Sequence, residues 1–412
     1  MESRFAMYLD QQKKKKIAAV LLWRRIRRQR TRTMYVRDIF DKRTVFGEFY
    51  HLIQELRESD PEYHFQYFRM TKASFDELLG LVHDRLVHSP THRSPISPAE
   101  RLAITLRFLA SPGSLGHVAI SYRMHKATLS GILQETLPAI WDCLSPLVLQ
   151  PPTSQQWEEI RREFCVKWNF PNAIGSIDGK HFAIRCPPNS GSIFHNYKKF
   201  YSMVLLAVVD AHYRFRLVDI GAAGHQSDGG VLRESNLGKA LAANTLQIPV
   251  VAEPAPPLCL LGDEAFPLKT YLMRPFPGRG LDYRKKVFNY RLSRGRRTVE
   301  NAFGILVSRW RAFLAPMHGT VEHCENMIKA GVCLHNFLTR DEAYRPPGYA
   351  DSERRGARVD GQWRADILNV GVNRSLGGNS SPAAISIRDQ LADHFISPRG
   401  AIPWQHDIVT RE

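Results

Sequence analysis

An alternation of strand-like and helix-like segments between residues 165 and 340 most constrains the fold of this chain. Short apolar runs bounded by glycine or polar residues are typical of buried strands, whereas apolar residues spaced three and four apart are typical of helices. The runs meeting at Ala211–His212 indicate a hairpin. The strand-like segments are 173–179, 201–210, 213–221 and 258–263, and the helix-like segments are 229–244 and 293–314.

The segment 293–314 carries the clearest helical pattern. Its apolar residues step by four, three, four and three positions, which predicts one core-facing stripe that includes Trp310 rather than base-stacking aromatics. The stripe consists of Val299, Phe303, Leu306, Trp310 and Phe313. Strand, hairpin, helix, strand and helix in this order predict an α/β domain of RNase H-like type, with a mixed sheet flanked by helices.

The preceding region reads as a helical domain. The segment 98–110 follows Ser97, a plausible N-cap, and the segments 114–124 and 126–144 are separated by a short break at His125. Such a pair resembles a helix-turn-helix, which would place Lys126, Thr128 and Ser130 in a DNA groove. The alternative is a bundle that only buttresses the next domain. We expect a basic segment at 1–45, this helical domain at 46–150, the α/β domain at 165–340 and a polar tail with a short helix at 341–412.

Charge is concentrated at the N-terminus. The whole chain has a formal net charge of +17, of which residues 1–33 contribute +9. This suggests an acidic polymer partner such as DNA, a nuclear import signal, or both. The import candidates are Lys13, Lys14, Lys15, Lys16, Arg24, Arg25, Arg27 and Arg28. No apolar run approaches the roughly 20 residues that span a bilayer, and no cysteines form a C-x-x-C pair, so we expect a reduced, intracellular protein without membrane contact.

Three acidic residues sit where catalysis could use them. Asp178 lies near the end of one apolar strand, Asp263 directly follows another, and Glu300 lies on the helix at 293–314. Carboxylates that converge repel one another, and hard divalent cations relieve that repulsion through oxygen ligation. Spacing alone does not single these three out, because Asp210, Asp219 and Asp228 compete on similar terms.

Several neighbouring residues carry weaker expectations. Arg294, Arg296 and Arg297 precede Glu300 by up to two turns and could contact phosphates, and Gly304 would let the helix approach the sheet or DNA closely. For Asp228 a helix cap is favoured over support of the site, and His181 is expected to pack or bind backbone rather than metal. Lys198 and Lys199 fit DNA contact and a solvated turn equally well.

Long words in a fixed order extend beyond these single residues. They are IGSIDGKHFAIRCP, HNYKKFYSMVLLAVVDAHYRF, VDIGAAGHQSDGGVLRES, LLGDEAFPLKTYLMRPF, FNYRLSRGRRTVENAFGILVSRWR and CLHNFL. Over about residues 65–340 the chain resembles the PIF/Harbinger transposases and the host nucleases derived from them. The resemblance implies an RNase H-like fold with an Asp-Asp-Glu triad, carried here by Asp178 of SIDG, Asp263 of GDEAF and Glu300 of TVENAFG.

The resemblance also implies function. It implies a nuclear transposase or endonuclease in which two divalent cations, Mg²⁺ or Mn²⁺, act at each site on double-stranded DNA at transposon ends and targets. The family pairs its transposase with a Myb-like DNA-binding protein, which weakens the case that residues 114–144 read sequence alone. Joining two ends requires two sites, so a homodimer or larger assembly is expected. The alternative is a domesticated protein, either a DNA- or chromatin-binding protein or a host nuclease without transposition.

Overall fold

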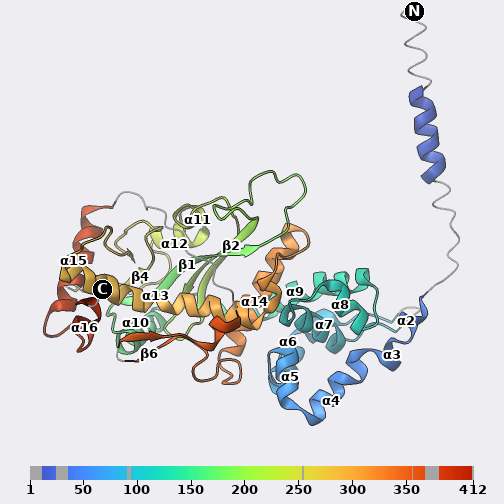
Figure 1. Ribbon diagram of the computed structural model, residues 1–412, viewed down its shortest axis with the longest axis horizontal. Helices are drawn as coiled ribbons and strands as arrows, with labels where there is room; N and C mark the ends of the chain where they lie inside the picture. The colour runs from blue at the N-terminus through green and yellow to red at the C-terminus, as the bar shows by residue number, and fades with distance from the viewer. Residues whose placement is uncertain are drawn as a thin grey trace, which may run out of the picture.

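The computed structural model describes residues 12–24, 36–90, 94–252, 255–354, 356–366 and 380–410. Its centre is a five-stranded sheet of order β3-β2-β1-β4-β5. β1 and β3 each pair antiparallel with β2, whereas β1, β4 and β5 run parallel. The strands are β1 (Ala173–Ala183), β2 (Ser202–Val209), β3 (Phe215–Ala223), β4 (Cys259–Leu261) and β5 (Leu272–Met273). The sheet confirms the predicted mixed α/β, RNase H-like architecture (Figure 1).

Helices hold the sheet in place. Every residue of β2 is buried, and α13 packs against β1, β2 and β4. The predicted stripe of α13 lies in the core, with Val299, Leu306 and Trp310 fully buried. The helices of this domain are α10 (Ser154–Trp168), α11 (Asp228–Glu234), α12 (Asn236–Ala242), α13 (Tyr283–Arg309), the short η2 (Arg311–Leu314) and α14 (Val321–Leu338).

The single helix expected at 229–244 is instead two helices, α11 and α12. Ser235 separates them and caps the second by accepting a hydrogen bond from the Gly238 amide at 2.9 Å. Gly238 lies so close to the Leu232 carbonyl that a Cβ there would sit 1.7 Å from the oxygen. A capping serine followed by a close backbone approach ended the helix where the apolar pattern continued.

The N-terminal part is helical. Ser97 caps α7 as expected, accepting from the Glu100 amide, and α9 packs along α14 of the sheet domain (Figure 1). Residues 12–24 are also helical. The other elements are α2 (Asp38–Asp41), α3 (Arg43–Phe46), η1 (Glu48–Tyr50), α4 (Leu52–Ser59), α5 (Pro61–Phe68), α6 (Lys72–Leu86), α7 (Pro98–Ala110), α8 (Leu115–Ser121) and α9 (Lys126–Val148).

The C-terminal part packs along α13. Trp363 donates a hydrogen bond to Asn301 at 2.8 Å and covers Gly304, where a Cβ would lie 2.4 Å from the indole. Gly304 therefore admits Trp363, and the expectation that this glycine faces the sheet or DNA was wrong. The elements here are β6 (Ser352–Arg354), β7 (Ala357–Val359), η3 (Gln362–Asp366), α15 (Pro382–Ile396) and α16 (Gln405–Thr410).

The described residues can be compared with the expectations about membrane contact and nuclear import. Within the described ranges, no helix combines the length and apolar character needed to cross a membrane. Lys13, Lys14, Lys15, Lys16 and Arg24 are exposed on the helix over residues 12–24, whereas Arg25, Arg27 and Arg28 lie outside the described residues.

Candidate active site

The register of the sheet places two of the predicted acids side by side. The parallel pairing of β1 with β4 matches Ser176 to Leu261, so Asp178 and Asp263, each two residues further along, follow at the same level. β4 ends there, and the Asp263 carboxylate accepts a hydrogen bond from the Ala265 amide at 2.9 Å. β1 continues past this point, which leaves its edge open beside Asp178 and Gly179.

The third acid is brought in by α13. The Ser176 hydroxyl lies 2.8 Å from the Gly295 carbonyl oxygen and 2.6 Å from the Thr298 hydroxyl, which fixes the helix over β1. Gly295 permits this approach, because a Cβ there would lie 2.3 Å from a Leu261 methyl. Glu300 is half-buried and lies slightly more than one helical turn after Gly295. Its charge raises the pKa of Asp178.

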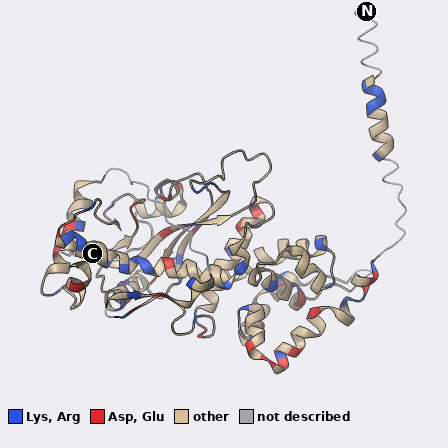
Figure 2. Cartoon of the chain, in the orientation of Figure 1, with Lys and Arg blue, Asp and Glu red and all other residues tan. Residues whose placement is uncertain are grey.

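Arg296 lies one turn before Glu300, on the same side of α13. Its guanidinium approaches Asp178 to 3.9 Å, and its Nε is buried with no hydrogen-bond partner. A cation therefore stands directly beside the predicted acids, with hydrogen-bonding capacity to spare. Along α13 in Figure 2, basic and acidic residues lie close to one another.

A fourth carboxylate joins the three, and the sequence reasoning placed it wrongly. The N-cap of α11 is Ser227, which accepts from the Gly230 amide at 3.3 Å, so Asp228 is not the expected cap. Asp228 packs on β1 instead: a Cβ on Gly179 would lie 2.1 Å from its Oδ1. That oxygen is buried and lacks a hydrogen-bond partner. The motif HQSDGG, which contains Asp228, was the sequence signal for this fourth acid. Grouping it with the SIDG motif of Asp178 would have identified the acid.

The pKa values report a crowded acidic site. Burial raises the pKa of Asp178 to about 6, with Arg296 opposing the rise and Asp263 and Glu300 adding to it. Burial also raises the pKa of Asp228 to about 7, reinforced by Asp178 and Asp263. Asp178 is therefore close enough to be repelled by Asp263 and Glu300, and Asp228 by Asp178 and Asp263.

A tight turn forms the rim of this site. The side chain of buried Asn196 accepts hydrogen bonds from the Lys198 and Phe200 amides and donates to Ser202 at 2.9 Å. The turn presents Tyr197, which is 53% exposed and packs edge-on against His181 at 5.8 Å. Burial raises the pKa of Tyr197, and the charges of Asp228, Asp178 and Asp263 raise it further, so its hydroxyl lies within electrostatic range of the acids.

His181 and Lys198 also take defined places in this rim. His181 Nδ1 lies 2.9 Å from the Ser202 hydroxyl, in agreement with a packing role. The Lys198 ammonium lies 5.5 Å from the centroid of the Tyr197 ring, and its charge opposes the rise in the pKa of Asp228. Sequence reasoning found no role for Tyr197, because an exposed aromatic in a loop carries no periodic signal.

The competing acids are engaged elsewhere. Asp210 is fully buried and forms ion pairs with Arg214 at 3.0 Å and Arg216 at 2.8 Å. Asp219 accepts a hydrogen bond from the Asn236 amide at 3.2 Å. Both carboxylates therefore have structural partners outside the acidic site.

Of the three arginines expected to meet DNA, two are committed to the fold. The Arg294 side chain is 4% exposed and pairs with Glu353 at 2.7 Å, and Arg297 pairs with the same carboxylate at 3.1 Å. Burial and pairing do not favour phosphate contact by Arg294 or Arg297, which leaves Arg296 as the arginine at the site.

The helix-turn-helix candidates lie elsewhere. Lys126 and Thr128 are exposed at the start of α9, and Ser130 is half-buried. Lys126 and Ser130 line a cavity of about 540 Å³ that Arg185 and His318 also line. These residues are therefore at the junction between the helical part and the sheet domain.

The mixed RNase H-like sheet places Asp178 and Asp263 at the same level on neighbouring parallel strands, with Glu300 on the helix that crosses them, an arrangement that suits phosphoryl transfer. Residues 177–336 match the family described as DDE superfamily endonuclease. Asp178, Asp228, Asp263 and Glu300 all lie within the matched region.

The chain is also similar to a plant protein and to mammalian proteins. The chain is 28% identical over 266 residues to "Protein ALP1-like" of Arabidopsis thaliana, covering 61% of this chain and 64% of that protein. It is 27% and 26% identical over 267 residues to "Putative nuclease HARBI1" of Bos taurus and of Homo sapiens, covering 63% of this chain and 72% of each relative. The alignment thus spans slightly less than two thirds of the Arabidopsis protein. No solved structure matches the chain.

Proposed function

We propose that this chain is a DNA endonuclease of the transposase type, which cuts transposon-end phosphodiesters and joins the freed 3′-hydroxyls to target DNA. The observation that carries the proposal is the convergence of Asp178, Asp263 and Glu300 from β1, β4 and α13 beside Arg296. The family match and the names of the relatives support nuclease chemistry.

The donor chemistry of the site fits hard divalent cations. Carboxylate oxygens are the ligands that Mg²⁺ and Mn²⁺ prefer, and the unpartnered Oδ1 of Asp228 adds a further oxygen to the set. Within the described residues, no three His, Cys, Asp or Glu side chains are already arranged to hold an ion, so these side chains would have to rotate. We propose Asp178, Asp263, Glu300 and Asp228 as the ligands.

Bound cations would activate a water or a 3′-hydroxyl and stabilise the leaving oxygen. The chain's own residues have other tasks. The free hydrogen-bonding capacity of Arg296 suits a phosphate oxygen beside Asp178. Lys198, on the rim turn, suits the next phosphate along the strand. Gly179, without a side chain, lets Asp228 reach the site.

The experiment compares cleavage of inverted-repeat DNA in Mg²⁺ or Mn²⁺ by the chain and three variants, Asp178→Ala, Asp263→Ala and Glu300→Ala. Each variant is expected to lose cutting. Glu264→Ala, which removes the acid next to Asp263, is the matched control and keeps it. Undiminished cutting by any of the three would remove that residue from the site.

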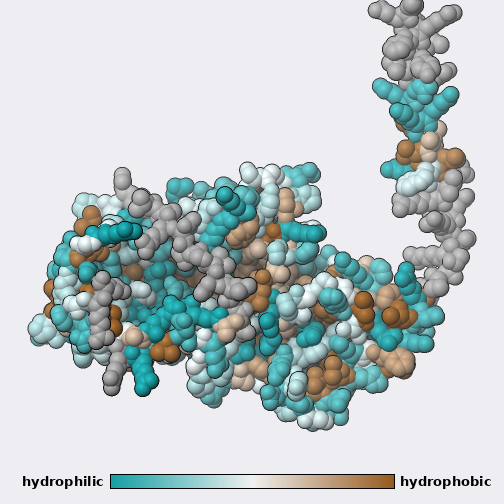
Figure 3. All heavy atoms as spheres, viewed as in Figure 1, coloured by the Kyte–Doolittle hydropathy of each residue, from teal (hydrophilic) through white to brown (hydrophobic). Residues whose placement is uncertain are grey.

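We also propose a protein partner, a nuclear location and an assembly of at least two copies of the chain. Exposed apolar residues on the helical part include Phe46 and Ile120, and separate brown patches lie on this part in Figure 3, as is common where proteins make contact. They support a protein partner such as a Myb-like DNA-binding protein. The basic helix at 12–24 supports nuclear import. Two joined DNA ends require at least two copies of the chain.

The alternative is a domesticated nuclear protein that keeps the fold for binding DNA or chromatin, or cuts without transposing. The presence of all the carboxylates favours cutting, since DNA binding alone has no use for buried acids that repel one another. Cleavage products without joined products in the same assay would identify a host nuclease.

A further inference from the structure

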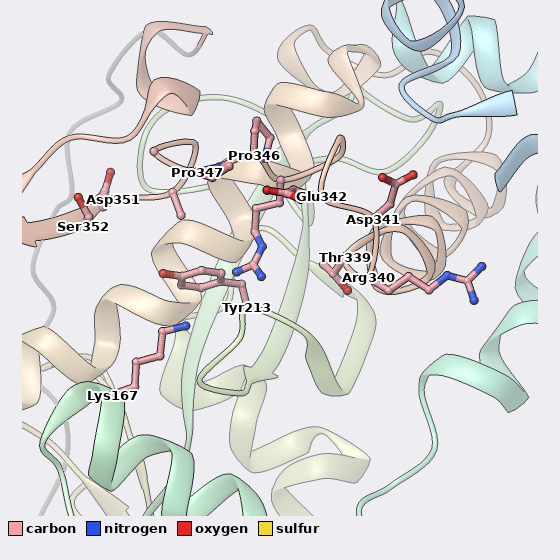
Figure 4. Close-up of a pocket in the computed structure, with 13 residues that line it drawn as sticks. Lys167, Tyr213, Thr339, Arg340, Asp341, Glu342, Pro346, Pro347, Asp351 and Ser352 are labelled. Atoms are coloured by element: carbon pink, nitrogen blue, oxygen red, sulfur yellow. The ribbon is translucent and has the colours of Figure 1, made fainter. Parts of the chain in front are cut away.

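A separate pocket lies at the turn that joins β2 to β3. It is a cavity of about 450 Å³ formed by the last turn of α10, the β2–β3 turn and the segment that follows α14. Lys167, Tyr213 and Arg345 are among the residues that line it. In Figure 4 the side chains of Lys167 and Tyr213 point toward one another across the pocket.

Two cations converge on one aromatic ring there. The Lys167 ammonium lies 5.3 Å from the centroid of the Tyr213 ring, and the Arg345 guanidinium lies 5.1 Å from it. In the part of the chain that the structure describes, neither cation forms an ion pair with a carboxylate. The Nε of Arg345 is buried without a hydrogen-bond partner. Burial lowers the pKa of Lys167, and the charge of Arg345 lowers it further.

Among the carboxylates around the pocket, Asp351 and Asp210 have arginine partners of their own, and the charges of Asp210 and Glu163 partly offset the fall in the pKa of Lys167. Asp341, in the pocket wall, accepts hydrogen bonds from the Thr71 and Ser74 hydroxyls, whereas Glu342 is exposed. The ion pairs are Asp351 with Arg364 and Asp210 with Arg214 and Arg216, whereas the neighbour of Glu163 is His212, whose pKa burial lowers.

We propose that this pocket binds a phosphate group carried on a larger molecule. A guanidinium with spare donors and an ammonium on the same cavity suit phosphate oxygens, and repulsion between the two cations is relieved when an anion enters. The cavity is much larger than a bare phosphate, so a sugar or base has room beside it. The phosphate belongs to a nucleic-acid strand or to a free nucleotide.

The position of the pocket is compatible with one DNA molecule reaching both sites. Ala207, paired with Asp178, precedes Tyr213 by six residues. At about 3.3–3.6 Å per residue, the pocket lies within about 25 Å of the acidic site. Phosphates on one strand are spaced by about 3.4 Å along the duplex, so the two sites are separated by at most several nucleotides.

The experiment measures binding by the full chain without divalent metal, so that no cutting intervenes. The probes are a short duplex of arbitrary sequence, adenosine monophosphate and inorganic phosphate. The variants are Lys167→Gln, Arg345→Gln and the double substitution. Arg162→Gln, which removes an exposed cation on α10 outside this pocket, is the matched control. Lys167→Arg keeps a charge at the end of α10 and separates loss of binding from loss of helix stability.

Each single variant is expected to bind at least one phosphate-bearing probe about fivefold more weakly, and the double variant more weakly still, while Arg162→Gln binds free nucleotide like the unmodified chain. If the duplex is the ligand, its log–log salt slope falls by about 0.9 for each phosphate that the variant no longer neutralises. An effect on the duplex alone identifies nucleic acid as the source, and an effect on adenosine monophosphate identifies a nucleotide.

Glu342→Gln is expected to tighten binding. A double variant that binds every probe normally overturns the proposal. These measurements need no cleavage, so they do not depend on the proposed nuclease activity.

Discussion

Replacing Asp178 by Asn is expected to stabilise the protein when no metal is present. Burial and the neighbouring acids raise the pKa of Asp178 from 3.8 to about 6, and its side chain is only 22% exposed. In the pH window between these values the folded chain holds a proton that the unfolded chain releases. Stability therefore falls as pH rises from about 4 to about 6, and the cost is fully present above that window.

The magnitude follows from the same shift. A rise from 3.8 to about 6 corresponds to at most about 3 kcal/mol, and this net rise already contains the opposing attraction of Arg296. For large domains 1 kcal/mol changes the Tm by roughly 2–4 °C. We expect Asp178→Asn to raise the Tm by several degrees at pH 8, and by less at pH 5.

Thermal unfolding at the two pH values, with chelator present, measures this directly. Asp210→Asn is the matched control: burial alone would raise the pKa of Asp210, but Arg216 and Arg214 hold it below its ordinary value. That variant should lower the Tm. Added Mn²⁺ should stabilise the unmodified chain and have little effect on Asp178→Asn. A Tm at pH 8 that falls or stays unchanged in Asp178→Asn would refute the electrostatic reasoning.

Three further outcomes are expected. Gly179→Ala should push the Asp228 carboxylate away from β1, so that stabilisation by Mn²⁺ weakens while the metal-free Tm changes little; equal stabilisation by Mn²⁺ would contradict a ligand role for Asp228. Gly304→Ala should clash with the Trp363 indole and lower stability by about 1–3 kcal/mol in denaturant titrations, whereas Gly80→Ala, with open space at its Cβ, should not. Tyr197→Ala should weaken binding of DNA with unpaired bases at the cut site about tenfold, because the exposed ring offers a stacking surface. Tyr197→Phe keeps the ring and should bind normally. An equal loss of binding in both variants would point to the hydroxyl instead.

The sheet and its crossing helix could be predicted because their signals are local. Continuous apolar runs gave β2 and β4, and the regular stripe from Val299 to Phe313 gave the buried face of α13. The selection of Asp178, Asp263 and Glu300 over Asp210 could not come from such patterns. In the sequence, Asp210 ends an apolar run just as Asp178 lies near the end of one. The family resemblance passes over Asp210, and its ion pairs across the β2–β3 turn give the physical reason.

What could not be predicted depends on contacts between distant segments. The fit of Asp228 over Gly179 joins residues about 50 positions apart, and Gly304 meets Trp363 from a segment that looked like a polar tail. Arg294 and Arg297 looked like surface cations on a basic helix, but Glu353 binds both. Each of these contacts pairs a small or charged residue with a partner whose identity follows from the tertiary fold alone.

The clamp that Glu353 and Trp363 place on α13 has a consequence for how the domain can be isolated. The family match ends at residue 336, before both residues, and begins after α10 and inside β1. A fragment cut at those limits would lose Ala173, Gly175 and Ser176, the residues of β1 that pair with β4. It would also leave the buried guanidinium groups of Arg294 and Arg297 without their counterion, Glu353. The face of α13 that Trp363 covers would become exposed. A fragment that keeps these contacts must therefore extend beyond the matched region at both ends, to include all of β1 on one side and Glu353 and Trp363 on the other.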